Sequence, residues 1–431
     1  VFGDFKKSEI GAMSGLLSYL EITQCTKKFP LTPPIKEAET KYLKIDASSR
    51  QSLEITKALN GQTNGSLLGS INQTVTSGGA RLLQERLNCP STSVKEIIKR
   101  QDLVSFFVLN HSIMTKCRDI LKQTPDMQRS LSRLGLDRGT AKDLGTIRNC
   151  LRTIDKIQSL MTDCEIPVLL EAFVKRLEGF DELLQSLTSA LIENSSATEK
   201  GEYIICSEYD ESLKEFRRLK HEAQDLIFDL QARYVNITNI NSLKIKYNNV
   251  LGYFVETPIS YSTKMSSDSF SETFIHRQTT TNCIRFSTIE LSNMASNILN
   301  AQERTEEIEQ NILRQLKDSI IIKSRELNSA AIALSEFDFY SSLSFQSISA
   351  EWNKPIVDNS KTFNITAGRH PVIELVLRNN GSDNFVSNDC NLSPNCKSMM
   401  LLTGPNMAGK STLMKQVALT VIMAQAGCFV A

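Results

Sequence analysis

Residues 402–412 read LTGPNMAGKST. The stretch has the spacing G-x-x-x-x-G-K-[ST], follows an apolar run at 399–402 and precedes a helical pattern that begins near Thr412. In such a setting, loop N–H groups and the helix N-terminus point at phosphate oxygens, the lysine reaches the β- and γ-phosphates, and the serine hydroxyl binds Mg²⁺. The sequence therefore predicts an ATP-binding P-loop made of Gly404, Pro405, Asn406, Met407, Ala408, Gly409, Lys410, Ser411 and Thr412, with Ser411 as the Mg²⁺ ligand.

The segment around this loop predicts an α/β domain from about residue 346 onward. Phe363 and Ile365 indicate one strand, and 399–402 indicates a second just before the loop. About twenty residues follow the loop, too few for the further strands of such a domain. No acidic residue follows Ser411 to hold Mg²⁺ or orient an attacking water. We therefore expect an incomplete domain that binds ATP without efficient turnover, and we assign no catalytic residue.

A helical arm with a β-containing tip is expected in the middle of the chain. Residues 208–234 carry apolar side chains at three- and four-residue spacing, which is typical of an amphipathic helix. From Leu243 to Val255 the period changes to two around a turn at Gly252, which predicts a β-hairpin. Residues 287–351 contain no glycine and no proline, so a very long helix is expected to return. Two helices of an ordinary bundle with an inserted hairpin remain an alternative.

Length and composition exclude several classes of protein. At 431 residues more than one domain is expected, with a helical body over 1 to about 150 and a breaker at Pro30–Pro34. Lys plus Arg number 49 against 48 Asp plus Glu, so any DNA contact must come from a local patch. The ten cysteines form no CxxC pair, which favours a reducing compartment over a disulfide scaffold or zinc site. The longest apolar stretch, 417–431, is too short to span a bilayer.

Several motifs resemble the MutS family of DNA mismatch-repair ATPases. The run 402–412 is similar to the family's Walker A segment, and its Thr-Gly-Pro-Asn-Met opening is more specific than a generic P-loop. Residues 368–372 resemble a Gly-Arg-His-Pro element, in which His370 would order the strand entering the ATPase domain. Residues 385–389 resemble the segment whose aromatic residue stacks on adenine, which adds Phe385 and Val386 to the ATP site. Further similarities lie at 67–70, 79–90, 100–101, 243–254 and 277–279.

The resemblance implies a multidomain fold. A mainly α-helical lever with a long helical arm and a small β-containing clamp would precede an incomplete α/β P-loop ATPase domain of the ABC type. The implied boundaries are 1–22 for the end of a connector domain, 23–206 and 278–345 for the lever, 207–277 for the clamp and 346–431 for the ATPase part.

The family also implies a function, namely ATP-dependent DNA mismatch recognition and the initiation of repair by a DNA-encircling clamp. Its clamp contacts the phosphate backbone of double-stranded DNA, which suits Lys244, Lys246, Asn248 and Asn249, although alternating lysines on a solvated strand face are the plain alternative. Residues 138–144 look like bacterial-type or organellar members, so a homodimer is expected, with a paralogue heterodimer as the alternative. A MutL-type partner and a cytoplasmic, nucleoid-associated location follow by resemblance, or a mitochondrial or nuclear one in other lineages.

Some departures keep other functions open. The mismatch-sensing domain, Walker B, the ABC signature and the dimer-completing helices are not in this sequence, and Ala408 replaces a common glycine. A MutS-like structural clamp for branched or recombining DNA, without mismatch sensing, is therefore the main alternative. A P-loop ATPase with a coiled-coil arm, of the chromosome-maintenance type, would share the arm but not the Gly-Pro-Asn-Met or Gly-Arg-His-Pro motifs.

Overall fold

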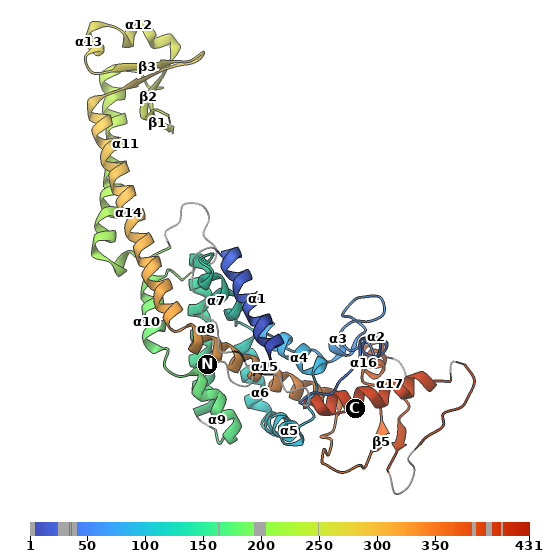
Figure 1. Cartoon of the computed structure of the whole chain (residues 1–431). Helices are drawn as coiled ribbons and strands as arrows, with labels where there is room; N and C mark the ends of the chain where they lie inside the picture. Colours follow the sequence, from blue (N-terminus) through green and yellow to red (C-terminus); the bar gives the residue numbers. More distant parts are fainter. Residues whose placement is uncertain are drawn as a thin grey trace. The chain divides into compact units, whose positions relative to one another are not determined.

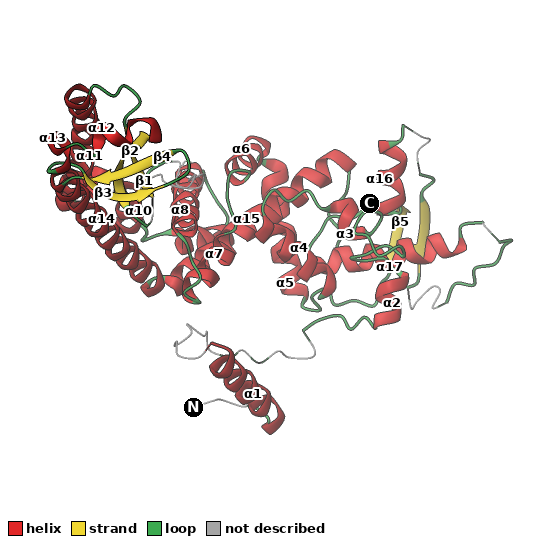
Figure 2. Cartoon of the chain, turned by 90° about the horizontal axis from the view of Figure 1, so that it is seen from above, coloured by secondary structure: helices red, strands yellow, loops and turns green. Residues whose placement is uncertain are grey.

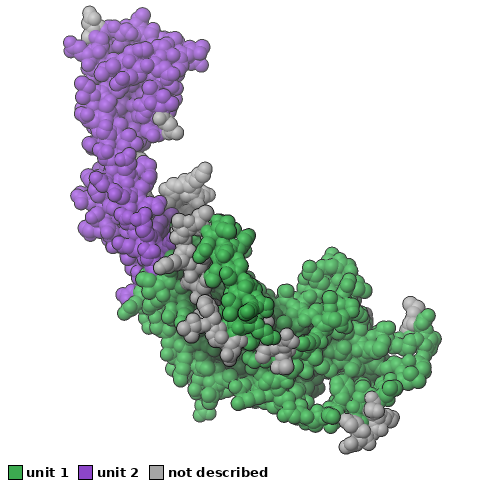
Figure 3. Space-filling model, in the orientation of Figure 1, with its two compact units in different colours: residues 1–184, 319–431 green, residues 185–318 purple. Residues whose placement is uncertain are grey.

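The computed structural model describes residues 5–24, 34, 36, 41–162, 164–193, 204–248, 250–381, 385–393, 399–406 and 408–431. The chain divides into two compact units, one made of residues 1–184 with 319–431 and the other of residues 185–318 (Figure 3). Helices dominate both units (Figure 2). Within the described ranges, no helix has the length and apolar character needed to cross a membrane. Most of the expected breaker, 30–33, lies outside the described residues.

The first unit contains a helical body built around one buried helix, α15 (Ser324–Ala350). Most of its residues are buried on all sides, because small and apolar side chains surround it and α4, α5 and α6 pack against it. The expected helical body before residue 150 is confirmed. Its helices are α1 (Lys7–Gln24), α2 (Ala47–Ser52), α3 (Leu67–Ile71), α4 (Ser77–Asn88), α5 (Val94–Leu109), α6 (His111–Leu121), α7 (Met127–Gly135), α8 (Ala141–Thr162), α9 (Val168–Val174) and a 3₁₀ turn, η1 (Lys175–Leu177).

The remainder of the first unit carries the loop motif. Its elements are β5 (Asn364–Gly368), α16 (Pro371–Asn379), β6 (Asn388–Asn391) and α17 (Lys410–Ala426), with β5 and β6 antiparallel. The strand indicated by Phe363 and Ile365 is thus present, one residue later. The strand predicted at 399–402 is wrong, because the structure leaves this segment without strand pairing. A strand needs a neighbour for its backbone N–H and C=O groups, and no described segment pairs with it. The expected α/β P-loop architecture is therefore not shown.

The second unit is an arm that carries a sheet (Figure 1). Helix α11 (Glu211–Thr238) and the antiparallel pair β1 (Lys244–Asn248) and β2 (Gly252–Pro258) confirm the amphipathic helix and the hairpin. The sheet order is β1-β2-β4-β3, and apolar side chains of α11, β2 and β4 form one core with Leu291 of α14. The other elements are α10 (Asp181–Ala190), η2 (Ser207–Tyr209), η3 (Ile259–Tyr261), α12 (Ser262–Met265), α13 (Asp268–Ser271), β3 (Ile275–Thr279), β4 (Cys283–Ser287) and α14 (Ile289–Ile322).

The prediction of a single very long helix after the hairpin is wrong in one respect. The structure has two helices, α14 and α15, separated at Lys323, whose φ of −91° and ψ of 13° leave the helical region. Neither glycine nor proline marks this break. The Lys323 ammonium instead donates to the carbonyl oxygen of Gly179 at 3.1 Å, and the buried helix α15 begins at the next residue. Tertiary contacts rather than local sequence therefore place the break.

Candidate functional site

Two glycines shape the P-loop at the start of α17. Gly404 has a φ of 154° and Gly409 a φ of 81°, both in the region that side chains other than glycine disfavour. Gly409 is the N-cap of α17 and offers no side chain to the first helical N–H groups. These donors, with the positive end of the helix dipole, are suited to an anion. Met407, one of the predicted site residues, lies outside the described residues.

The Lys410 side chain folds over this loop. Its ammonium donates to the carbonyl oxygen of Gly404 and, at 2.9 Å, to that of Pro405. Ser411 and the loop residues Pro405, Asn406 and Ala408 are exposed, and Thr412 is half-buried. The methyl group of Ala408 is therefore accommodated without burial. The described loop residues and the lysine thus lie together at the start of α17.

The segment that carries Phe385 and Val386 is fastened to the same helix. The Asn388 amide donates to the side-chain oxygen of Gln416 at 3.5 Å, and Gln416 is fully buried in α17. Gln416 lies six residues after Lys410, which corresponds to roughly 9 Å along the helix axis. Phe385 is half-buried, whereas Val386 is 81% exposed. Asn388, three residues after Phe385, thus reaches α17 less than two helical turns from the P-loop.

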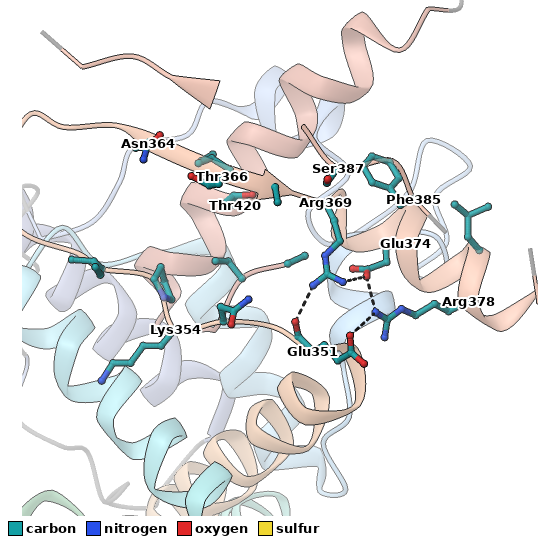
Figure 4. A pocket seen from close by; sticks show the side chains of 18 residues that line it. Glu351, Lys354, Asn364, Thr366, Arg369, Glu374, Arg378, Phe385, Ser387 and Thr420 are labelled. Carbon is teal, nitrogen blue, oxygen red and sulfur yellow. Dashed lines mark hydrogen bonds and ion pairs between the residues drawn. The ribbon is translucent and has the colours of Figure 1, made fainter. Parts of the chain in front are cut away.

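A cavity of about 950 Å³ is lined in part by Phe385, and none of the described P-loop residues lines it (Figure 4). Three cations line the cavity among the described residues, and each is ion-paired. Arg369 contacts Glu374 at 2.5 Å, Arg378 contacts the same carboxylate at 3.0 Å, and Lys354 contacts Asp102 at 2.7 Å. Because these charges are neutralised within the protein, the cavity does not present an open cationic site to a phosphate group. Its size alone does not make it the phosphate site.

His370 has a capping role that was not predicted from the sequence. It follows β5 and caps α16, where its Nδ1 accepts a hydrogen bond from the N–H of Ile373 at 3.3 Å. The residue therefore begins a helix, and its predicted role in ordering the strand stays a prediction. Burial, and next the nearby charge of Lys415, lower the pKa of His370 to about 4, so the ring is neutral near pH 7.

The hairpin presents a polar face on which the predicted DNA contacts have different surroundings. Lys244, Lys246 and Asn248 share one face of β1, because side chains alternate along a strand. The Lys246 ammonium lies 2.6 Å from Glu256, and Arg285 of β4 contacts that carboxylate at 3.1 Å. Lys244 is exposed beside them. Asn248 accepts hydrogen bonds from the N–H groups of Val250 and Leu251, so its side-chain oxygen builds the turn.

Sequence reasoning did not find Glu256, Arg285, Gln416 or Glu54 as neighbours of the predicted site residues. Arg285 and Glu256 pair across β2 and β4, and alternation within 283–287 would have placed Arg285 on the polar face. No sequence signal links Glu54 to α17. Asn249 lies outside the described residues, and among the described residues no group of three or more His, Cys, Asp or Glu is placed to hold a metal ion.

Comparison with known proteins assigns the family. Residues 48–344 match MutS domain III, and residues 400–431 match MutS domain V. The chain belongs to the MutS family. It is 44% identical over 430 residues to the DNA mismatch repair protein MutS of Ruegeria sp. (strain TM1040), and 42% identical over 431 residues to that of Roseobacter denitrificans. Both alignments cover 100% of this chain and 49% of the MutS relative, so the chain spans about half the length of these relatives.

Within the MutS framework, the two matches fall on the two features described above. The match to domain III ends within α15 and includes the whole hairpin-bearing unit, and the match to domain V begins just before the P-loop. The two family matches thus include the helical body, the hairpin-bearing unit and the loop motif before α17.

Proposed function

We propose that this chain binds Mg²⁺-ATP at its P-loop. The observation that carries the proposal is the arrangement of Gly409, the uncapped start of α17 and the Lys410 ammonium around one loop. Lys410 would exchange the carbonyl oxygens of the loop for β- and γ-phosphate oxygens, and the Ser411 hydroxyl would hold Mg²⁺. The adenine ring would stack on Phe385 and contact Val386, because the Asn388–Gln416 contact holds that segment against the same helix.

The arm would contact double-stranded DNA through the phosphate backbone. Lys244 and Lys246 supply positive charge on one face of the hairpin, and Arg285 adds to it, while Glu256 offsets one charge. Such contacts hold DNA without reading its sequence. The segments 23–206 with 278–345 would act as the lever, 207–277 as the clamp, and 1–22 and 346–431 as connector and ATPase parts.

In the whole protein, these parts would perform ATP-dependent mismatch recognition and initiate repair, as the names of the MutS relatives indicate. ATP between paired ATPase domains would bias the clamp between two states. A homodimer in the bacterial cytoplasm, followed by recruitment of a MutL-type factor, completes the proposal. A structural clamp for branched DNA is the second candidate, although 44% identity to mismatch-repair proteins favours the first.

The direct test is equilibrium binding of a fluorescent ATP analogue with Mg²⁺ to the chain and to its Lys410→Ala variant. We expect the wild type to bind and the variant to lose at least about tenfold in affinity, since the phosphates lose a charge-assisted partner. Equal binding by both proteins would exclude the P-loop as the site. To separate the two candidate functions, mismatched and four-way-branched duplexes of equal length are compared with the intact protein.

A further inference from the structure

Helix α17 is fastened to the helical body at both ends. At its C-terminal end, the N–H of Ser91 donates to the carbonyl oxygen of Gln425 at 3.1 Å, and Gly427 packs against the Arg100 side chain. Near the P-loop, the Lys415 ammonium lies 2.9 Å from the carboxylate of Glu54. Lys415 follows Lys410 by five residues, or roughly 7.5 Å along the axis, so this ion pair attaches α17 to the helical body close to the P-loop.

Glu54 is held by several interactions at once. Its φ of 52° is in the left-handed region, which is strained for a residue with a side chain. Its carboxylate accepts a hydrogen bond from the N–H of Leu59 at 3.0 Å as well as from Lys415, and its carbonyl oxygen accepts from the N–H of Leu67 at 2.9 Å. Leu67 is the first residue of α3, so Glu54 connects the loop before α3 to α17.

The surroundings make this contact more than an exposed surface pair. The side chains of Lys415 and Glu54 are 29% and 25% exposed, and the buried ring of His370 lies close enough to both charges to affect its pKa. Burial raises the pKa of Glu54, but the hydrogen bonds from Lys415 and Leu59 outweigh it and lower the pKa below its ordinary value. Helix α3 packs against α16, and α16 against α17. Three elements therefore meet at one ion pair.

We propose that the Glu54–Lys415 ion pair positions the P-loop, so that the helical body sets the affinity of the loop for nucleotide phosphates. By reciprocity of coupling, phosphate binding then alters the segment around Glu54. This inference rests on the proposed ATP site and names the contact that would regulate it. Neither residue touches the nucleotide, so both are positioning residues.

The test compares the direction in which each variant changes the affinity for nucleotide. Removal of charge through space would act oppositely in the two variants: Glu54→Gln would strengthen anion binding, and Lys415→Met would weaken it. Loss of positioning instead weakens binding in both. We expect both single variants to bind the fluorescent ATP analogue about fivefold more weakly, and the double variant Glu54→Gln/Lys415→Met to bind about as weakly as either single variant, because all three lose the same contact.

Asp102→Asn is the matched control, because it breaks the Lys354–Asp102 pair of the same unit, which is 2.7 Å long and remote from the P-loop in sequence. The Asp102→Asn variant should bind the fluorescent ATP analogue with the same affinity as wild type. Hydrogen exchange supplies a second readout: the analogue should protect residues 53–67 in wild type but not in Lys415→Met. Opposite signs, unchanged affinities or additive losses in the double variant would overturn the inference. Absence of binding by the wild type, in contrast, would overturn the ATP site itself.

Discussion

Arg86 and Glu336 form a buried ion pair in which the guanidinium Nη2 lies 2.6 and 2.7 Å from the two carboxylate oxygens. The guanidinium also donates to the Tyr340 hydroxyl and lies 4.3 Å from the centre of the Phe339 ring. This cluster joins α4 to the central helix α15. Each charge neutralises the other away from water. The packing of α4 against α15 therefore depends on both partners of the pair.

Glu336→Gln should destabilise the first unit by about 3–5 kcal/mol, because it leaves the buried Arg86 charge without a counter-charge. The measurement is urea unfolding followed by the fluorescence of Trp352, the only tryptophan and a buried one. The double variant Arg86→Met/Glu336→Met should lose less than Glu336→Gln. A larger loss in the double variant would contradict the explanation by an unpaired charge.

Gly79→Ala should cost about 1–3 kcal/mol, since a Cβ there would lie 2.2 Å from Oδ2 of Asp338 and 2.9 Å from its Cβ. The Asp338 side chain is held in place, because its carboxylate accepts one hydrogen bond from the N–H of Val75 and another from the N–H of Thr76. Gly135→Ala is the control, as no atom lies within 4 Å of its added Cβ, and it should be neutral or slightly stabilising. Equal stability of the two variants would refute the steric argument.

The free energy of unfolding of the first unit should fall as the pH is lowered. The fall occurs over the pH range in which His370 is protonated in the unfolded chain but neutral in the folded one. Its folded pKa of about 4 lies below the ordinary histidine value of 6.5, so the unfolded state binds the proton more tightly. The stabilisation is complete above about pH 6.5 and is lost towards pH 4. Between pH 7 and pH 5, wild type should lose about 2 kcal/mol more than His370→Gln.

Urea titrations at the two pH values measure this difference. His221→Gln serves as the control, because that side chain is 82% exposed in the arm and its replacement should leave the pH dependence of the first unit unchanged. The same pH dependence in His370→Gln as in wild type would assign the effect to other groups.

Lys244→Met should weaken duplex binding equally for all sequences. Loss of one phosphate contact lowers the slope of log K against log salt concentration by about 0.9. Binding is measured by fluorescence anisotropy at several salt concentrations. Lys214→Met is the control in the same unit, where the lysine pairs with Glu208 at 2.9 Å. An unchanged slope for Lys244→Met would remove the hairpin face from the proposed DNA contact.

Local sequence predicted those elements whose signals lie within a few residues. The amphipathic helix α11, the hairpin of β1 and β2, and the turn into α17 each follow from spacing, alternation or glycine. The strand at 399–402 was predicted from the same kind of signal but is not formed, because strand formation also needs a partner that local sequence does not specify. The roles of the P-loop residues and of Lys244 and Lys246 stay predictions.

The sequence by itself determined the phosphate-binding motif, the periodicity of the arm and the family resemblance, since these are written in neighbouring residues. Only the tertiary structure decided the break at Lys323 and the contact of Glu54 with Lys415, which are 361 residues apart. These features depend on which surfaces pack together. Such long-range contacts are selected by the burial and pairing of the whole unit, and no local pattern encodes them.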